Sequence, residues 1–293
     1  MTKPVTSVAA MMLVEDGKLE LSAPVDTYLP ELKGMRVGVE RKLAATGEAD
    51  IVLEKAKRPM TVRDLLRHTA GLTYPEEDST AVHRLCRRAA FAADNTLAEF
   101  VASLAKRPLV HQPGEVWEYS WSVDVLARVV EVASGQSFDR FLRDRLFKPL
   151  GMADSGFYVP EDKLARLVDA PPGDGPATWD VGKRPKLLSG GGGLVSTAPD
   201  YLRFCQMLLN GGERDGVRIL RQNTLAQMTK NSLPAGVRFA SAVGAFVGPA
   251  AGASWGLGFA IRTKSAFQRG ARGSRQLRMG RRLGHDVLDR SGP

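Results

Sequence analysis

The stretch MTKPVTSVAAMML (residues 1–13) gives the first indication of the fold. Residues 4–14 are apolar and mostly small, which is typical of a helix that is buried on several sides. Glu15-Asp16-Gly17 then marks the end of the helix and a turn. We therefore expect a buried helix at the very start of the chain, beginning without an N-cap residue.

Lys3 lies at the start of this helix, where it shares a face with the residue three positions earlier. A Ser in that position would give the pattern Ser-x-x-Lys, with its hydroxyl beside the Lys amine and at a helix N-terminus that stabilises negative charge. Such a Ser can attack a carbonyl and form an acyl-enzyme. Here the position falls before Met1, so we expect the chain to start just after its own nucleophile. The alternative is an ordinary start with a solvated Lys3.

A second motif, YSWSVDVL (119–126), follows PGEVWE (113–118) and precedes FKPLGM (147–152). Three further stretches occur in the same chain: LLRHTAGL (65–72), GGGGLVSTAPD (190–200) and WGLGF (255–259). Together with Lys3, these motifs and their order resemble the serine hydrolases related to class C β-lactamases and penicillin-binding proteins. The Trp at position 121, where the lactamases carry Asn, favours the esterases known as family VIII.

This resemblance implies an α/β (α+β) fold of the β-lactamase/transpeptidase type, with a helical domain and an incomplete antiparallel sheet. It implies Lys3 and Tyr119 as the catalytic residues, with Tyr119 relaying protons for the nucleophile. Residues implied to bind substrate are Ser120, Trp121, Ser122, Gly191 and Gly192. The His-Thr-x-Gly-Leu turn that contains His68 is structural in this family.

The function that the resemblance implies is hydrolysis of short-chain esters, with β-lactams as the other substrate class, through an acyl-enzyme. The expected partner is a small-molecule ester or lactam, with no cofactor, and the chain is expected to be inactive without the Ser. Two alternatives remain open. One is a non-catalytic binding protein with a basic nucleic-acid-binding tail, and the other is Thr2 as an N-terminal nucleophile.

Composition places the chain among globular proteins, with 43% hydrophobic and 25% charged residues. No apolar run reaches membrane-spanning length, and no export signal is present, so a cytoplasmic location is expected. Two distant cysteines indicate neither a disulfide framework nor a metal site. The four histidines are isolated in sequence, so no metal site is expected: His68, His83, His111 and His285.

The net charge of +9 belongs mainly to residues 264–293, which hold eight Lys or Arg side chains and two acidic ones. We therefore divide the chain into a hydrolase domain, 1–263, and a basic, disordered tail outside the family, 264–293. When the codons of Met279 and Gly280 are read in a frame shifted by one base, they must encode Trp. We therefore expect that the tail is translated out of frame. Nucleic-acid binding by the tail is not the expected function, and the tail is not expected to complete the sheet.

Two other patterns resemble sites without fitting the family order. Ser103-Leu104-Ala105-Lys106 is a literal Ser-x-x-Lys, but it lies at the end of a helix, where we expect it to be solvated. The glycines at 190–193 lack the Gly-Lys-Ser/Thr ending of a phosphate loop, so we expect them to allow close approach of the backbone to the site. Elsewhere we expect helices at 61–68, 79–107, 124–134, 138–147 and 199–209. We expect residues 33–58 to be irregular and residues 255–262 to form one strand.

Overall fold

The computed structural model describes residues 1–42, 49–74, 80–87, 94–168, 180–240, 252–262 and 277–278. Its α-helices are α1 (Thr2–Glu15), α2 (Val62–Leu66), α3 (Ala81–Arg87), α4 (Leu97–Leu104), α5 (Ser122–Ser134), α6 (Phe138–Leu142), α7 (Lys148–Leu150), α8 (Ala198–Leu209) and α9 (Gln222–Met228). A π-helical turn, Arg143–Phe147, joins α6 to α7, and single 3-10 turns span Val25–Thr27, Pro30–Leu32 and Glu161–Arg166. None of the described helices is both long and apolar enough to cross a membrane.

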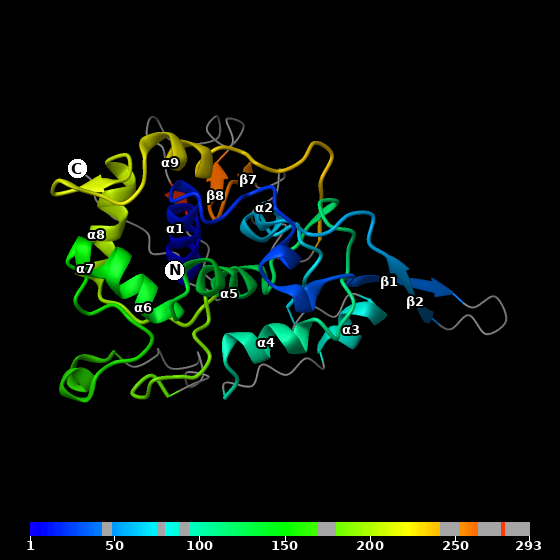
Figure 1. Ribbon diagram of the computed structural model, residues 1–293, viewed down its shortest axis with the longest axis horizontal. Coiled ribbons are helices and arrows are strands. Elements are labelled where there is room, and N and C mark those ends of the chain that lie inside the picture. Colours follow the sequence, from blue (N-terminus) through cyan, green and yellow to red (C-terminus); the bar gives the residue numbers. More distant parts are fainter. Residues whose placement is uncertain are drawn as a thin grey trace.

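Helix α1 is buried, as predicted, and other helices surround it (Figure 1). Ten consecutive residues, Pro4–Leu13, are buried, and α1 packs against α5. Small side chains such as Ala9 and Ala10 allow this close packing from several directions. No side chain caps the N-terminus of α1, which agrees with the prediction. The first turn of α1 is therefore held inside the protein by its surroundings.

The other predicted helices are confirmed and have local signals at their ends. Thr197 caps α8 by accepting a hydrogen bond from the backbone N–H of Asp200. Helix α5 ends at Gly135, whose positive φ of 69° closes the helix in the left-handed conformation. The segment predicted to be helical at 79–107 contains α3 and α4, with residues 88–93 outside the described part.

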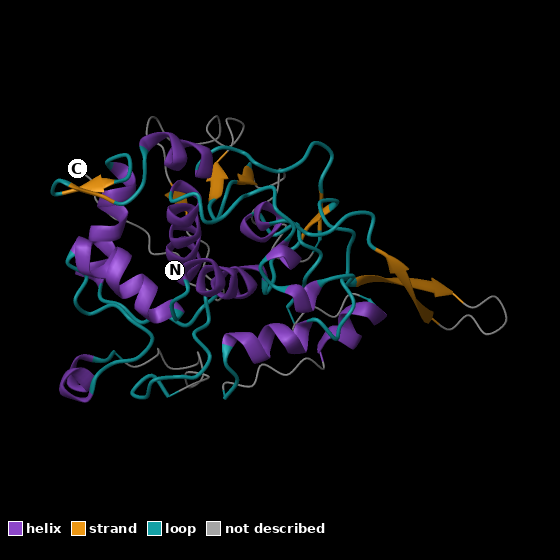
Figure 2. Ribbon diagram, in the orientation of Figure 1, coloured by secondary structure: helices purple, strands orange, loops and turns teal. Residues whose placement is uncertain are grey.

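The described strands form four small sheets, which lie apart from one another around the helices (Figure 2). They are β1 (Arg36–Lys42), β2 (Ala49–Lys55), β3 (Val116–Trp117), β4 (Glu213–Arg214), β5 (Val217–Arg218), β6 (Arg238–Phe239), β7 (Ala253–Trp255), β8 (Ala260–Arg262) and β9 (Leu277–Arg278). The pairs β1–β2, β4–β5, β7–β8 and β8–β9 are antiparallel, and β3–β6 is parallel. The sheet that the fold class requires is thus represented by short pieces among the described residues.

The prediction that residues 33–58 are irregular is wrong, because β1 and β2 form an antiparallel hairpin there (Figure 1). Val37 is buried, whereas Leu53 is 46% exposed. Charged residues interrupt the apolar alternation that identifies a half-buried strand. In the hairpin, Val37 lies opposite Glu54 and Val39 opposite Val52.

Two predictions about the C-terminal strands also need correction. Residues 255–262 do not form one strand: they comprise the last residue of β7, a turn at 256–259 and β8, and Gly258 in the turn adopts a φ of +87° that other residues rarely reach. Residues 277–278 pair with β8, placing Ile261 opposite Leu277. The expectation that no residue after 264 joins the sheet is therefore wrong at these two positions, and the remaining residues of the tail lie outside the described part.

Asp64 connects α2 to the segment that leads into it. Its carboxylate accepts hydrogen bonds from Arg58 at 2.6 Å, Arg67 at 2.8 Å and the backbone N–H of Thr61 at 2.9 Å. Burial raises the pKa of Asp64, but the two guanidinium groups and Thr61 outweigh burial and hold the pKa well below its usual range. Asp64 therefore stabilises the folded state in its ionised form.

We expect Asp64→Asn to lower the free energy of unfolding at pH 7 by roughly 3 kcal/mol, because it leaves Arg67 without its buried carboxylate. A depressed folded-state pKa adds stability above the unfolded pKa, and that stability is lost as pH falls through the folded one. The difference between the two proteins should therefore shrink below about pH 4. Urea unfolding at several pH values measures it, and the exposed Glu54→Gln should have little effect in the same series.

Candidate active site

Lys3 lies in the first turn of α1 and its side chain is enclosed by three segments that are distant in sequence. Its Nζ donates a hydrogen bond to the carbonyl oxygen of Gly191 at 2.8 Å and also hydrogen-bonds with Tyr74. Burial lowers the pKa of Lys3, but the nearby Tyr74, Tyr119 and Asp124 outweigh it and raise the pKa above its ordinary value. The group is therefore an ammonium ion at neutral pH, and Lys3 is not a solvated terminal residue.

Tyr119 is half-buried between β3 and α5, and Lys3 faces its ring. The Lys3 Nζ lies 4.5 Å from the ring centroid of Tyr119 and 5.4 Å from that of Tyr74. Both distances are within the range of a cation–π interaction. The two catalytic residues predicted from sequence are thus brought together, although 116 positions separate them in the chain.

Asp124, on α5, forms hydrogen bonds with the glycine-rich segment 189–193. Its Oδ1 accepts hydrogen bonds from Ser189 Oγ at 2.5 Å and from the backbone N–H of Gly191 at 3.0 Å. Gly191 therefore gives its N–H to Asp124 and its carbonyl to Lys3. Burial raises the pKa of Asp124, and the positive charge of Lys3 opposes that rise.

Gly191 and Gly192 differ sharply in the space around them. A Cβ on Gly191 would overlap the Asp124 carboxylate, whereas a Cβ on Gly192 would meet no atom within 4 Å. We expect Gly191→Ala to lower the free energy of unfolding by about 1–3 kcal/mol through overpacking. The matched control is Gly192→Ala, which should change it by less than about 0.5 kcal/mol. Thermal unfolding of both variants measures the contrast, and equal melting temperatures would contradict it.

The chain matches the beta-lactamase family model over residues 1–285. It belongs to the beta-lactamase family. The match runs past residue 263, at which the sequence predicts a change to non-family tail; the position of that boundary stays a prediction. The α/β class and the β-lactamase-like fold are confirmed by the family match and by the solved structures that resemble this one.

The relatives of this beta-lactamase family member include esterases. It is 37% identical to Protein Rv1367c of Mycobacterium tuberculosis, covering 80% of this chain and 58% of the relative. It is 33% identical to a lovastatin esterase of Penicillium rubens, covering 71% of this chain and 53% of that protein. The structure of EstCE1, a hydrolase with promiscuous acyltransferase activity, superposes with a TM-score of 0.65 and 25% identity, over 90% of this chain and 68% of that one. The chain thus spans somewhat more than half the length of the curated relatives.

The residues predicted to bind substrate from the Tyr119 motif occupy different environments in this family member. Ser120 and Ser122 are buried, and their hydroxyls hydrogen-bond with each other at 2.8 Å. Trp121 is half-buried and packs against Tyr74 and Phe100. Ser120 and Ser122 thus hold the Tyr119 segment in place, and substrate binding by the three residues stays a prediction.

His68 supports Tyr119 from behind, which agrees with its predicted structural role. Its Nδ1 accepts a hydrogen bond from the backbone N–H of Ser120 at 3.2 Å, so its proton is on Nε2. The ring centroids of His68 and Tyr119 are 4.7 Å apart. Burial, followed by the charge of Lys3, lowers the pKa of His68 well below its usual value. A neutral imidazole is therefore packed against the site.

The hydroxyls of the other two candidate nucleophiles, Ser103 and Thr2, form hydrogen bonds with backbone groups. Ser103 Oγ donates to the carbonyl oxygen of Phe100 at 2.7 Å, at the end of α4, and Lys106 is exposed, as predicted. Thr2 is buried, and its hydroxyl accepts a hydrogen bond from the backbone N–H of Leu194 at 3.1 Å. Neither hydroxyl is bonded to the Lys3 amine among the described contacts.

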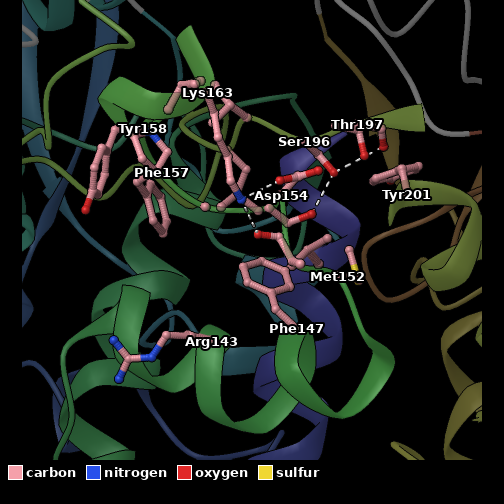
Figure 3. Close-up of a pocket in the computed structure, with 18 of the residues that line it drawn as sticks. Arg143, Phe147, Met152, Asp154, Phe157, Tyr158, Lys163, Ser196, Thr197 and Tyr201 are labelled. Carbon is pink, nitrogen blue, oxygen red and sulfur yellow. Dashed lines mark hydrogen bonds and ion pairs between the residues drawn. The ribbon is translucent and has the colours of Figure 1, made fainter. Parts of the chain in front are cut away.

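A cleft of about 1230 Å³ opens beside the N-terminus of α1 and meets the Lys3 site at Thr2 and Gly192. Figure 3 shows the apolar side chains of Phe147, Met152 and Phe157 along it. Asp154 forms ion pairs with Lys163 at 2.6 Å and Arg166 at 2.8 Å on the polar side of the cleft. Lys3 and Tyr119 themselves do not line it.

Tyr74 and Asp124 were not predicted from the sequence. Tyr74 comes two residues after the HTAGL turn, and Asp124 lies within the YSWSVDVL motif, so both adjoin stretches that were already identified. Their proximity to family motifs is the only signal in the sequence that would have pointed to them. Their contacts with Lys3 and Gly191 depend on long-range packing.

Proposed function

We propose that this chain provides the Lys–Tyr part of an acyl-transfer site that hydrolyses small carboxylic esters. The observation that carries the proposal is the position of Lys3: its ammonium group is held between the Gly191 carbonyl, the Tyr74 hydroxyl and the face of Tyr119. This geometry occurs in the first turn of α1. A hydroxyl three residues before Lys3 would share its helix face.

In the proposed reaction, a Ser hydroxyl at that position attacks the ester carbonyl and gives an acyl-enzyme. The Ser proton passes to the oxygen of Tyr119, which supplies a proton to the departing alcohol. Lys3 acts by its charge, because an ammonium stabilises negative charge that develops on nearby oxygens. Water then attacks the acyl-enzyme by the reverse proton path and releases the acid.

Esters are favoured over β-lactams by two observations. Trp121 stands where the lactamases carry Asn, and its ring packs on Tyr74 in the wall of the site. The relatives include an esterase and a hydrolase with acyltransferase activity. The cleft beside Thr2, with Phe147 and Phe157 on its wall, offers an apolar surface for the acyl or alcohol part of an ester. No cofactor enters the proposed reaction.

Residues 1–293 contain no Ser three positions before Lys3, because that position precedes Met1. We therefore propose that the polypeptide of these residues does not turn over esters unless the Ser is supplied. Comparing its ester hydrolysis with that of a chain supplied with the Ser and flanking segments tests the proposal. The alternative of a nucleic-acid-binding tail depends on residues 264–293, almost all of which lie outside the described part.

A further inference from the structure

Three side chains that can bind metals meet on the far side of the Tyr119 segment: His83, His111 and Glu118. His83 belongs to α3, His111 lies between α4 and β3, and Glu118 directly follows β3. Each offers one ligand atom, and these atoms all lie within 4.8 Å of one another. No metal site was predicted, because the four histidines are isolated in the sequence. His83 and His111 are 28 positions apart, so the structure reveals a cluster that the spacing conceals.

The distances within this His–His–Glu cluster are close to those of a shared metal ion. His83 Nε2 lies 3.2 Å from each carboxylate oxygen of Glu118, and His111 Nε2 lies 2.7 Å from Oε2. Two ligand atoms bound at about 2.0–2.1 Å to a tetrahedral ion are about 3.3 Å apart. The His83 pair already has this separation, and the His111 pair requires an outward shift of a fraction of an ångström.

Burial and neighbouring contacts orient the three ligands. Glu118 is 1% exposed and His83 is 3% exposed. Thr80 Oγ1 contacts His83 Nδ1 at 2.7 Å, so the other nitrogen, Nε2, faces Glu118. Hydrogen bonds from the outer nitrogen of a His are a usual feature of metal sites, because they fix the ring orientation.

The backbone at these positions is also fixed. The Glu118 N–H donates to the carbonyl oxygen of His68 at 2.9 Å. Gly71 leaves room for the His111 carbonyl, which a Cβ at position 71 would overlap. The His111 side chain retains 19% exposure, which leaves one direction open to water.

We propose that His83, His111 and Glu118 bind one Zn(II) ion, with water as the fourth ligand on the side of His111. Two imidazole nitrogens and one carboxylate suit Zn(II), whereas Mg(II) and Ca(II) prefer sites made of oxygen atoms. The ion would join α3 and the segment before β3 to Glu118, which immediately precedes Tyr119. Its role would be structural, and it does not depend on the proposed ester hydrolysis.

The competing explanation is a hydrogen-bonded triad in which both imidazoles donate to Glu118 and no metal binds. His83→Gln separates the two, because its amide can still donate to Glu118 but is a poor zinc ligand. Replacing both free thiols, Cys86→Ser with Cys205→Ser, is the matched control. It removes both thiols of the chain and keeps the three side chains of the cluster.

The test is calorimetric titration of the metal-free 293-residue chain with ZnCl₂, accompanied by CoCl₂ absorption spectra and thermal unfolding. We expect one equivalent of Zn(II) to bind, a rise in melting temperature, and intense visible bands of tetrahedral Co(II). His83→Gln should weaken Zn(II) binding by at least about 10-fold, and the double Ser variant should not.

Absence of stoichiometric binding, or binding that persists in His83→Gln, would overturn the proposal. Loss of binding in the double Ser variant would assign the ion to the thiols and overturn it equally. Circular dichroism establishes that each variant is folded. If His83→Gln does not fold, His111→Gln replaces it, because the His111 side chain is more exposed than that of His83, with the same expected weakening.

Discussion

The polypeptide of residues 1–293 is expected to hydrolyse p-nitrophenyl butyrate no faster than buffer does. The reason is that, among the described residues, neither Thr2 nor Ser103 bonds its hydroxyl to the Lys3 amine, since both hydroxyls are hydrogen-bonded elsewhere. Loss of a nucleophile that acts as one unit with its partners lowers kcat by a factor on the order of 10⁶. Release of p-nitrophenol at 405 nm measures the rate, with nitrocefin assayed in parallel for lactams.

The matched protein is a chimera in which residues 1–263 are flanked by the corresponding segments of EstCE1, with Ser directly before Met1. It should hydrolyse the butyrate ester, and Ala in place of that Ser should return the rate to background. Ester hydrolysis by residues 1–293 that survives Ser103→Ala and removal of Thr2 would contradict the proposed site. A folded chimera without activity would contradict it as well.

The success of the helix predictions has a local cause. A capping residue such as Thr197, a terminating glycine such as Gly135 and a regular apolar spacing all act within a few residues of the helix that they define. The hairpin of β1 and β2 was not predicted, because charged side chains interrupt the apolar alternation in both strands. The register of the hairpin depends on how the two strands pair with each other, which apolar periodicity does not reveal.

The site itself was predictable only in part. Lys3 and Tyr119 were identified by their motifs, and the fold brings them within 4.5 Å, measured from Nζ to the ring centroid. Tyr74 was missed because no pattern in sequence indicates which ring will reach a given amine. The contact between His83 and Glu118 was missed for the same reason, since the two residues are 35 positions apart in the sequence. Contacts of this kind follow from packing of whole elements, so they become visible only in three dimensions.

Tyr119→Phe should lower the turnover of the active chimera by about 10²–10⁴-fold, the range for loss of one acid–base group. Lys3→Ala should lower it by about 10²–10³-fold, the range for loss of one group that stabilises developing negative charge. Lys3→Ala removes the ammonium that faces both tyrosines, and Tyr119→Phe retains the ring while removing the oxygen through which the proton passes. The matched control is Lys106→Ala, because Lys106 belongs to the other Ser-x-x-Lys and is exposed.

The measurement must separate loss of catalysis from loss of structure, since Lys3 also holds the Gly191 carbonyl. Turnover is therefore measured as kcat and KM beside the melting temperature. Tyr119→Phe is the cleaner of the two, because no described hydrogen bond to another side chain depends on its hydroxyl. A drop in kcat with an unchanged melting temperature assigns the oxygen of Tyr119 to the reaction. A Tyr119→Phe chimera that keeps full kcat would remove Tyr119 from the proton path and leave Tyr74, which hydrogen-bonds with Lys3, as the oxygen to be tested in its place.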